Sequence, residues 1–377
     1  GLAATSVITT GAGTVQAGIL ENTPRLDYSG GATCPSLLLE PSRTNIFSQS
    51  EYYNTYWNLS NSSVANNQST SPEGLINASV LSVVIPSQAG INVFNSWSDS
   101  TTYTMSAFVK KKIGSYIGFG LYGNTLGDNW IKWNLDNGTS TINNLWTNAN
   151  FEDYGNGWYR ISATITTTTG NTSKSGFKLN PMISSSYSNG NVGDEVYIYG
   201  AQLEEGSYPT SYIPTYSTSA TRAADTSSKA DASGEINSTE GVLYAEIAAL
   251  ADDGTYRIFS LNDGTREERV YIQYKPTSNE ISGVVKNGNV TQANISYVLS
   301  DETQYAKIAF KWKENDFAFW VNGVERGTDT SGIVPVGLSK LSFDQGNDSN
   351  YFFGKVNALQ VYKEALTDTE LATLTTI

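Results

Sequence analysis

Apolar and polar residues alternate along short stretches of this chain. Clear examples are residues 103–109, 161–166, 195–199, 241–247 and 269–274. A period of two places the apolar side chains on one face of a β-strand and the polar ones on the other. The pattern therefore predicts many short, half-buried strands.

Turn-forming dipeptides separate these stretches. Their first residues are Asn137, Asn189, Asp253, Asp263, Asn287 and Asn322, each followed by glycine. Such pairs tolerate the positive φ angles that tight hairpin turns require. Short strands joined by tight turns are typical of antiparallel β-sandwiches. One short helix is expected near the C-terminal end, where Thr367 and Glu370 fit a capping box.

The length of 377 residues predicts two or three domains at about 100–200 residues each. Residues 217–234 are poor in large apolar side chains and are predicted to be a linker. Residues 1–43 form an extended lead-in, expected to lie against the first sandwich or a neighbouring subunit. The predicted domains are then residues 44–216 and residues 235–377.

Composition excludes several classes of function. Histidine is absent and Cys34 is the only cysteine, so a histidine base, a histidine metal site, an Fe–S cluster and an intrachain disulfide are excluded. A net charge of −13 argues against a nucleic acid partner. No apolar stretch approaches the ~20 residues of a membrane span, so membrane insertion is not expected.

The first sandwich resembles a known family of modules. Residues 43–50, Trp57 and residues 71–74 are similar to the opening of galactose-binding-like jelly rolls, the fold of many carbohydrate-binding modules. Residues 200–215 with residues 221–225 resemble the exit of these modules and are the most specific match. With the lead-in, the resemblance covers roughly residues 20–225 and extends to phage tail and head-fibre proteins.

The second sandwich resembles concanavalin A-like or laminin G-like domains. The residues that carry this resemblance are 317–325 and 354–371. That fold hosts lectins, hydrolases, lyases and adhesion modules, so it indicates architecture better than function. The predicted fold class is all-β: two antiparallel β-sandwiches, a jelly roll and a concanavalin A-like sandwich, with an extended N-terminal segment.

Aromatic side chains in polar surroundings supply the candidate binding site. A sugar ring presents a C–H face and a rim of hydroxyls, which fit an exposed aromatic ring beside polar groups. Trp130 and Trp133 are three residues apart, which in a strand places them on opposite faces, one in the core and one exposed. The candidate glycan-binding residues are Trp97, Tyr122, Asn124, Asp128, Trp130, Trp133 and Trp146. The alternative is that each tryptophan belongs to the core, which is the expectation for Trp158, Trp312 and Trp320.

Acidic residues offer weaker candidates. Glu204 and Glu205 are adjacent, so in a strand they point to opposite faces and do not make a glycosidase pair. Jelly-roll binding modules often carry a structural Ca²⁺, which prefers oxygen ligands. The candidate calcium ligands are Asp263, Asp344, Asn347 and Asp348, with Glu21 and Asp27 as a second group. No cofactor is otherwise expected.

The resemblance implies a non-catalytic phage virion-surface protein, a tail or head fibre, that binds glycans on the host surface. Its expected partners are a host polysaccharide, other virion proteins and further copies of itself, as a trimer in many fibres. It would act outside the cell. Three alternatives stay open: a structural virion or capsid-decoration protein without a ligand, a polysaccharide depolymerase or lyase, and an accessory module of a secreted bacterial enzyme. A depolymerase or lyase needs a cleft with two facing carboxylates, or a tyrosine beside an arginine or lysine that neutralises a uronate.

Overall fold

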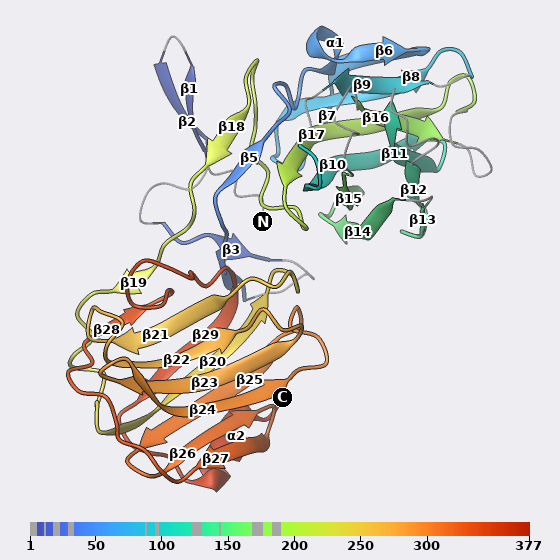
Figure 1. Ribbon diagram of the computed structural model, residues 1–377. Coiled ribbons are helices and arrows are strands. Elements are labelled where there is room, and N and C mark those ends of the chain that lie inside the picture. Colours follow the sequence, from blue (N-terminus) through green and yellow to red (C-terminus); the bar gives the residue numbers. More distant parts are fainter. Residues whose placement is uncertain are drawn as a thin grey trace. The chain divides into compact units, whose positions relative to one another are not determined.

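The computed structural model describes residues 6–10, 13–17, 23–28, 34–86, 89–94, 98–122, 130–142, 145–167, 176–182 and 190–377 (Figure 1). Contacts divide the chain into two units. The first unit holds residues 1–23, 29–32 and 42–223, and the second holds residues 24–28, 33–41 and 224–377. In the described part of the chain, neighbouring strands of each sheet pair antiparallel, so the all-β prediction is confirmed.

Two six-stranded sheets build the sandwich of the first unit. Sheet 1 has the order β14-β15-β10-β17-β8-β7, and sheet 2 has the order β13-β12-β11-β16-β9-β6. The bounds in sheet 1 are β7 (Ser62–Thr70), β8 (Ile76–Val83), β10 (Thr102–Ile113), β14 (Trp146–Asp153), β15 (Trp158–Thr166) and β17 (Glu195–Glu205). The bounds in sheet 2 are β6 (Asn58–Ser60), β9 (Gly90–Phe94), β11 (Tyr116–Tyr122), β12 (Trp130–Asn134), β13 (Ser140–Ile142) and β16 (Gly176–Met182).

The strand order of the first unit is that of a jelly roll. Strands β8, β17, β10 and β15 lie side by side in sheet 1, and β9, β16, β11 and β12 lie side by side in sheet 2. Along the chain, β8 to β11 alternate between the two sheets. The consecutive strands β11 and β12 lie in the same sheet, and β15 to β17 alternate again, which is the pattern of two Greek keys. The predicted jelly roll is therefore confirmed.

Smaller elements accompany this sandwich. They are the hairpin of β1 (Ser6–Thr10) and β2 (Gly13–Ala17), the pair β5 (Arg43–Asn45) and β18 (Ala220–Arg222), and the single turn α1 (Tyr53–Tyr56). The core between the sheets is rich in aromatic rings. Phe119 packs edge-on against Trp133 with ring centroids 4.9 Å apart, and Trp146 lies 6.1 Å from the same phenylalanine.

The second unit is a sandwich of a six-stranded and a seven-stranded sheet. Sheet 3 has the order β19-β28-β21-β22-β23-β24, and sheet 4 has the order β27-β26-β25-β20-β29-β4-β3. The bounds in sheet 3 are β19 (Ser228–Lys229), β21 (Arg257–Asn262), β22 (Arg269–Tyr274), β23 (Glu280–Asn287), β24 (Val290–Val298) and β28 (Lys340–Ser342). The bounds in sheet 4 are β3 (Leu26–Asp27), β4 (Ser36–Leu39), β20 (Glu240–Ala249), β25 (Ala306–Lys313), β26 (Phe317–Val321), β27 (Val324–Asp329) and β29 (Gly354–Tyr362).

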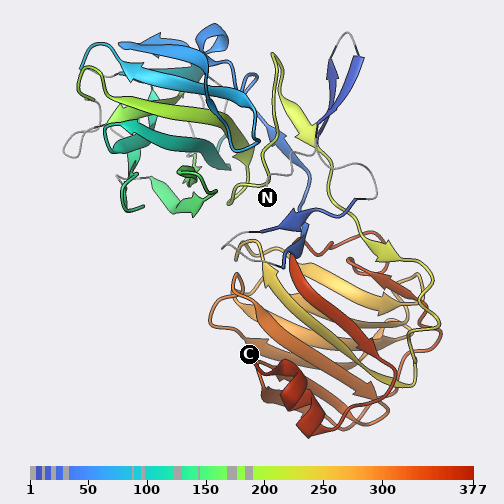
Figure 2. The ribbon, with the colours of Figure 1, turned by 180° about the vertical axis from the view of Figure 1, so that it is seen from behind.

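The C-terminal helix packs on the outer face of sheet 4. Helix α2 (Asp368–Thr375) begins with the predicted capping box of Thr367 and Glu370. Its Leu371 is fully buried in a cluster with Val242 and Trp320. Figure 2 shows the helix from behind, against the strands of the second unit. Among the described residues, no helix is long and apolar enough to span a membrane.

The lead-in is divided between the two units. Residues 1–23 and 29–32 group with the first unit, whereas β3 and β4 extend sheet 4 of the second, because β4 pairs with the open edge of β29 and β3 pairs with β4. A contact of the lead-in with a neighbouring subunit stays a prediction. Leu39 enters the core of the second unit. The segment 217–234 is likewise shared: β18 pairs with β5 in the first unit, and β19 pairs with β28 in the second.

Candidate functional site

The outer face of sheet 2 gathers aromatic and polar side chains. On β11, Ile117 and Phe119 are fully buried and point into the sandwich, so Tyr116, Gly118 and Gly120 occupy the opposite face. The register pairs Gly120 with Trp130, Gly118 with Lys132, and Tyr116 with Asn134. Directly paired residues share a face, and this set therefore stands on the outer side.

A lysine lies between two aromatic rings on this face. Lys132 Nζ is 5.4 Å from the ring centroid of Tyr116 and 5.5 Å from that of Trp130. These distances are those of cation–π contacts. Between the rings, β11 contributes only the two glycines, Gly118 and Gly120, which add no side chain. Both rings are half-buried, so part of each surface reaches solvent.

Polar groups surround the two rings. Asn134 Nδ2 donates a hydrogen bond to Tyr116 Oη at 3.3 Å. Lys132 is largely buried, and this burial lowers the pKa of its ammonium group. The row that begins at Trp130 continues through Gly120 and Lys178 to Asn92. Within the described part of the chain, the buried Asn92 Oδ1 has no hydrogen-bond partner, so this acceptor is suited to a ligand hydroxyl.

We define Tyr116, Trp130, Lys132, Asn134 and Asn92 as the sheet 2 face. The aromatic rings offer stacking surface, and the amides, the phenol and the ammonium offer hydrogen bonds. This combination matches the C–H face and hydroxyl rim of a sugar ring. Of the sequence-derived candidates, Trp130 belongs to the face, and Tyr116, Lys132, Asn134 and Asn92 were missed. The available signal was the spacing of two residues between Trp130, Lys132 and Asn134.

Two of the predicted binding tryptophans are core residues. Trp133 is 0% exposed and Trp146 is 2% exposed, so neither ring can stack on a ligand and this part of the prediction is wrong. Trp146 looked loop-like because polar residues flank it, yet it begins β14 opposite Ile165 and points inward. Trp158, Trp312 and Trp320 are buried as expected.

The remaining predicted glycan-binding residues lie outside what the structure describes. Trp97, Asn124 and Asp128 fall in undescribed segments. Tyr122 ends β11, but its side chain is outside the described set. These four positions therefore stay predictions.

The candidate calcium ligands Asp263, Asp344 and Asn347 accept hydrogen bonds from nearby residues within turns. Asp263 Oδ1 accepts hydrogen bonds from Thr265 N at 2.8 Å and Thr265 Oγ1 at 2.7 Å. Asp344 is 4% exposed and accepts from Gly346 N, and Asn347 Oδ1 accepts from Ser349 Oγ at 2.6 Å. Asp348 is exposed on the same loop. In the described segments, no group of three or more histidine, cysteine or acidic side chains is arranged to hold a metal ion.

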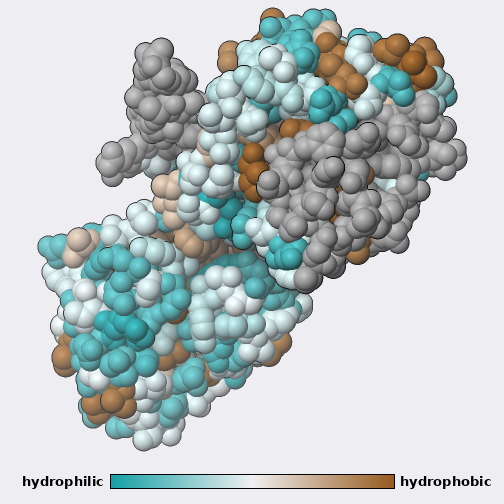
Figure 3. Space-filling view, turned by 45° about the horizontal axis from the view of Figure 1, so that its top comes forward, coloured by the Kyte–Doolittle hydropathy of each residue, from teal (hydrophilic) through white to brown (hydrophobic). Residues whose placement is uncertain are grey.

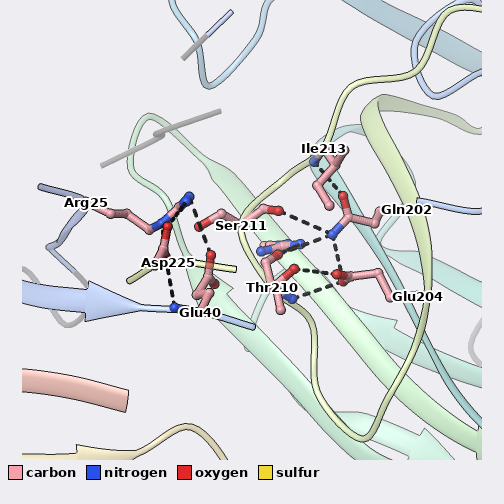
Figure 4. A network of polar contacts seen from close by, with 9 residues as sticks. Arg25, Glu40, Gln202, Glu204, Thr210, Ser211, Ile213 and Asp225 are labelled. Atoms are coloured by element: carbon pink, nitrogen blue, oxygen red, sulfur yellow. Dashed lines mark hydrogen bonds and ion pairs between the residues drawn. The ribbon is translucent and has the colours of Figure 1, made fainter. Parts of the chain in front are cut away.

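The adjacent glutamates near the end of the first unit do not form a catalytic pair. Glu204 is 0% exposed and its carboxylate accepts from Gln202 Nε2 at 2.7 Å and from Thr210 N at 3.0 Å, as Figure 4 shows. Burial raises the pKa of this carboxyl group, and the Thr210 hydrogen bonds oppose the rise. Glu205 is exposed on the other side of the strand. The exit motif therefore forms a buried hydrogen-bond network of Gln202, Glu204 and Thr210 in the first unit.

A second network joins distant parts of the second unit. Arg25 Nε and Nη2 each lie 3.0 Å from an oxygen of Asp225, and Glu40 N donates to Asp225 Oδ2 at 2.9 Å (Figure 4). Arg25 and Glu40 are nearly inaccessible to solvent. These residues hold the lead-in strands to the main body of the unit, which is a structural role.

Comparison with known proteins supports the fold of the second unit. Residues 234–372 match the family model described as the concanavalin A-like lectin/glucanases superfamily. The second unit is a concanavalin A-like sandwich. The match covers this unit and not the first. A comparison with curated protein sequences found no match.

Solved structures give only distant similarity. A Ruminococcus gnavus sialidase CBM40 module bound to sialyllactose is 15% identical, with a TM-score of 0.33, over 37% of this chain and 84% of that chain. Sheep galectin-11 is 9% identical, with a TM-score of 0.25, over 36% of this chain and 95% of the galectin. Mouse laminin α1 domains LG4-5 are 11% identical, with a TM-score of 0.27, over 76% of this chain and 88% of the laminin chain. Values this low carry no conclusion about the ligand of this chain.

Proposed function

We propose that this chain is a non-catalytic glycan-binding protein and that the sheet 2 face is its binding surface. The observation that carries the proposal is Lys132 Nζ placed 5.4 Å and 5.5 Å from the rings of Tyr116 and Trp130. The C–H face of a sugar would stack on Trp130, and its hydroxyls would pair with Asn134, Lys132 and Asn92. The family model matched by the second unit also groups lectins with glucanases.

The proposal includes where the protein acts and how it assembles. The sequence resemblance to phage tail and head-fibre proteins favours a virion-surface adhesin that attaches to host glycans. Single sites of this kind bind weakly, so a homo-oligomer, a trimer in a fibre, would supply avidity. Binding through stacking and hydrogen bonds requires no cofactor, and a structural calcium ion stays an untested addition.

The experiment that tests the proposal is affinity electrophoresis of the full chain through gels that contain bacterial and algal polysaccharides. Retardation should appear with at least one polysaccharide. Trp130→Ala should weaken binding about tenfold, because the loss of one stacking ring removes roughly 1.4 kcal/mol of binding free energy. Tyr28→Ala removes another exposed ring, on the lead-in, and is the matched control. Free migration through every gel would favour the alternative of a structural virion protein without a ligand.

One observation favours a second candidate function, a polysaccharide lyase. Tyr116 lies beside Lys132, the arrangement expected of a tyrosine base next to a cation that neutralises a uronate. In such a β-elimination the tyrosine removes the proton next to the carboxylate, the C–O bond to the leaving sugar breaks, and the leaving oxygen takes up a proton. Clearing of a polyuronate gel, lost in Tyr116→Phe, would establish the lyase. Retardation without clearing would exclude it for that polymer.

A further inference from the structure

A row of cationic side chains crosses sheet 3 of the second unit. The register places Lys340 opposite Asn262, Asn262 opposite Arg269, and Arg269 opposite Lys286. Directly opposed residues of neighbouring antiparallel strands stand on the same face. Lys340, Arg269 and Lys286 therefore share one face.

This face is the outer one. The neighbours of the row along each strand, Leu261, Val270 and Val285, belong to the core between the two sheets. Because side chains alternate along a strand, the row points away from that core. Arg269 is 1% exposed, whereas Lys286 and Lys340 are half-buried and reach solvent. Figure 3 shows that hydrophilic residues dominate the visible surface of this unit.

Arg266 adds a fourth positive charge beside the row. With the amide orientation that satisfies its neighbours, the Gln345 side-chain oxygen accepts from Arg266 Nε at 2.9 Å and Nη2 at 2.8 Å. Arg269 Nη1 donates to the backbone carbonyl oxygen of Gln345 at 2.9 Å. The Arg269 guanidinium lies 4.9 Å from the ring centroid of Tyr271. Both guanidinium groups are thus held in place by neutral partners. The pKa of Lys286 is lowered by burial first, and then by Arg269 and Arg266.

No carboxylate pairs with these four cations among the residues that the structure describes. Other cations of the same unit do have partners. Lys275 Nζ lies 2.6 Å from Glu280, and Lys355 Nζ lies 2.6 Å from Asp27. Like charges directly opposite each other in a sheet are destabilising. Glu267 and Asp263 are close enough to oppose the lowering of the pKa of Arg269 by burial, but neither forms an ion pair with it. In a chain of net charge −13, four cations without an ion-pair partner in the described segments point to a site for an external anion.

We propose that the row Lys340–Arg269–Lys286, with Arg266, binds an acidic polysaccharide. The row runs from β28 to β23, three inter-strand steps or about 14 Å, which exceeds one small anion and suits charges repeated along a chain. The adjacent row across the same face, Ser342, Ser260 and Tyr271, is buried, so the contacts to a polymer would come from Lys340, Lys286 and Arg266. A nucleic acid is another polyanion that such a row could bind, so duplex DNA is one arm of the test.

The test uses the full chain in affinity gels that contain polygalacturonate, dextran sulfate or uncharged dextran. We expect retardation by polygalacturonate, by dextran sulfate or by both, and none by dextran. The polymer that retards the chain shows whether the site takes carboxylates or sulfates. The double variant Lys286→Gln/Lys340→Gln should weaken binding about three- to tenfold, and high salt should weaken the wild type as well. Lys313→Gln, on sheet 4, is the matched control because Lys313 Nζ already pairs with Glu240 at 3.0 Å.

Three results would overturn the proposal. They are equal retardation by all three polymers, unchanged binding in the double variant, and equally strong binding of duplex DNA. The row belongs to the second unit and the sheet 2 face to the first. Trp130→Ala should therefore leave binding of polygalacturonate by the row intact. Loss of binding in Trp130→Ala alone would assign the acidic polymer to the first unit instead.

Discussion

Arg25 and Asp225 lie 200 positions apart in the sequence and form a two-pronged ion pair, with both nitrogen–oxygen distances at 3.0 Å. Glu40 completes the arrangement: its backbone nitrogen donates to Asp225 at 2.9 Å, and its carboxylate lies 3.5 Å from Arg25. The guanidinium thus balances two carboxylates at one point of the second unit. The ion pair joins the strands before the jelly roll to the segment that follows it, so the second sandwich needs both.

Asp225→Asn should destabilise the second unit by about 3 kcal/mol, because it leaves the buried Arg25 with a weaker partner. The measurement is denaturant-dependent amide hydrogen exchange in strands β20 to β29, which reports on the second unit separately from the first. Glu364→Gln is the matched control, since Glu364 is exposed. Equal stability of the two variants would show that the network is not needed for the fold.

Trp133→Ala and Trp130→Ala should differ strongly in their effect on stability. Trp133 fills the jelly-roll core, so its truncation should cost about 3–5 kcal/mol. Trp130 is half-buried on the sheet 2 face, and its truncation should cost less than about 1 kcal/mol while reducing glycan retardation. The free energy of unfolding of each variant checks this. Similar losses for both would place Trp130 in the core rather than on a binding face.

The alternation of side chains explains what the sequence could predict. Trp130 and Trp133 were expected on opposite faces, and the strand period placed them so. Glu204 and Glu205 separated for the same reason. Each of these predictions depends on local geometry within one strand, which a single sequence contains.

Features that depend on pairing between strands were not predicted. Leu37 and Leu39 sit in a short lead-in whose pattern does not reveal that β29 offers an open edge to β4. Lys132 looks like an ordinary strand lysine until the register brings Tyr116 beside it. Arg269 and Lys286 are likewise joined only by register. Trp146 misled because Thr147 and Asn148, the polar residues that follow it in β14, are exposed although Trp146 is buried.

Thr367→Ala should loosen helix α2 by about 1 kcal/mol, because Thr367 Oγ1 accepts from Glu370 N and caps the first turn. The expected result is faster amide hydrogen exchange in residues 368–375, with little change in the sandwich. Thr369→Ala is the control, since Thr369 is exposed within the helix. Because alanine has a higher helix propensity than threonine, Thr369→Ala should not speed exchange. Unchanged exchange in Thr367→Ala would show that the cap does not set the stability of α2.

Glu302 should make the second unit less stable as the pH rises. Its side chain is 1% exposed, and its Oε1 lies 3.7 Å from Arg257 Nη1. Burial, with the nearby charge of Asp252, raises the pKa of this carboxyl group to about 7, from 4.5. The folded state therefore holds the proton more tightly than the unfolded state, so this contribution is complete below about pH 4.5 and is lost as the pH rises through 7.

The expected loss across that window is about 3 kcal/mol, from a shift of roughly two to three pH units. Glu302→Gln carries no titrating proton at this position and should flatten the dependence. The measurement is the free energy of unfolding of both proteins at a series of pH values between about 4 and 8. Glu280, whose hydrogen bond to Lys275 lowers its pKa, gains stability only as the pH rises to about 4.5 and contributes a constant amount above it. The test is therefore the difference between the two proteins, and equal slopes would show that Glu302 titrates normally in the folded chain.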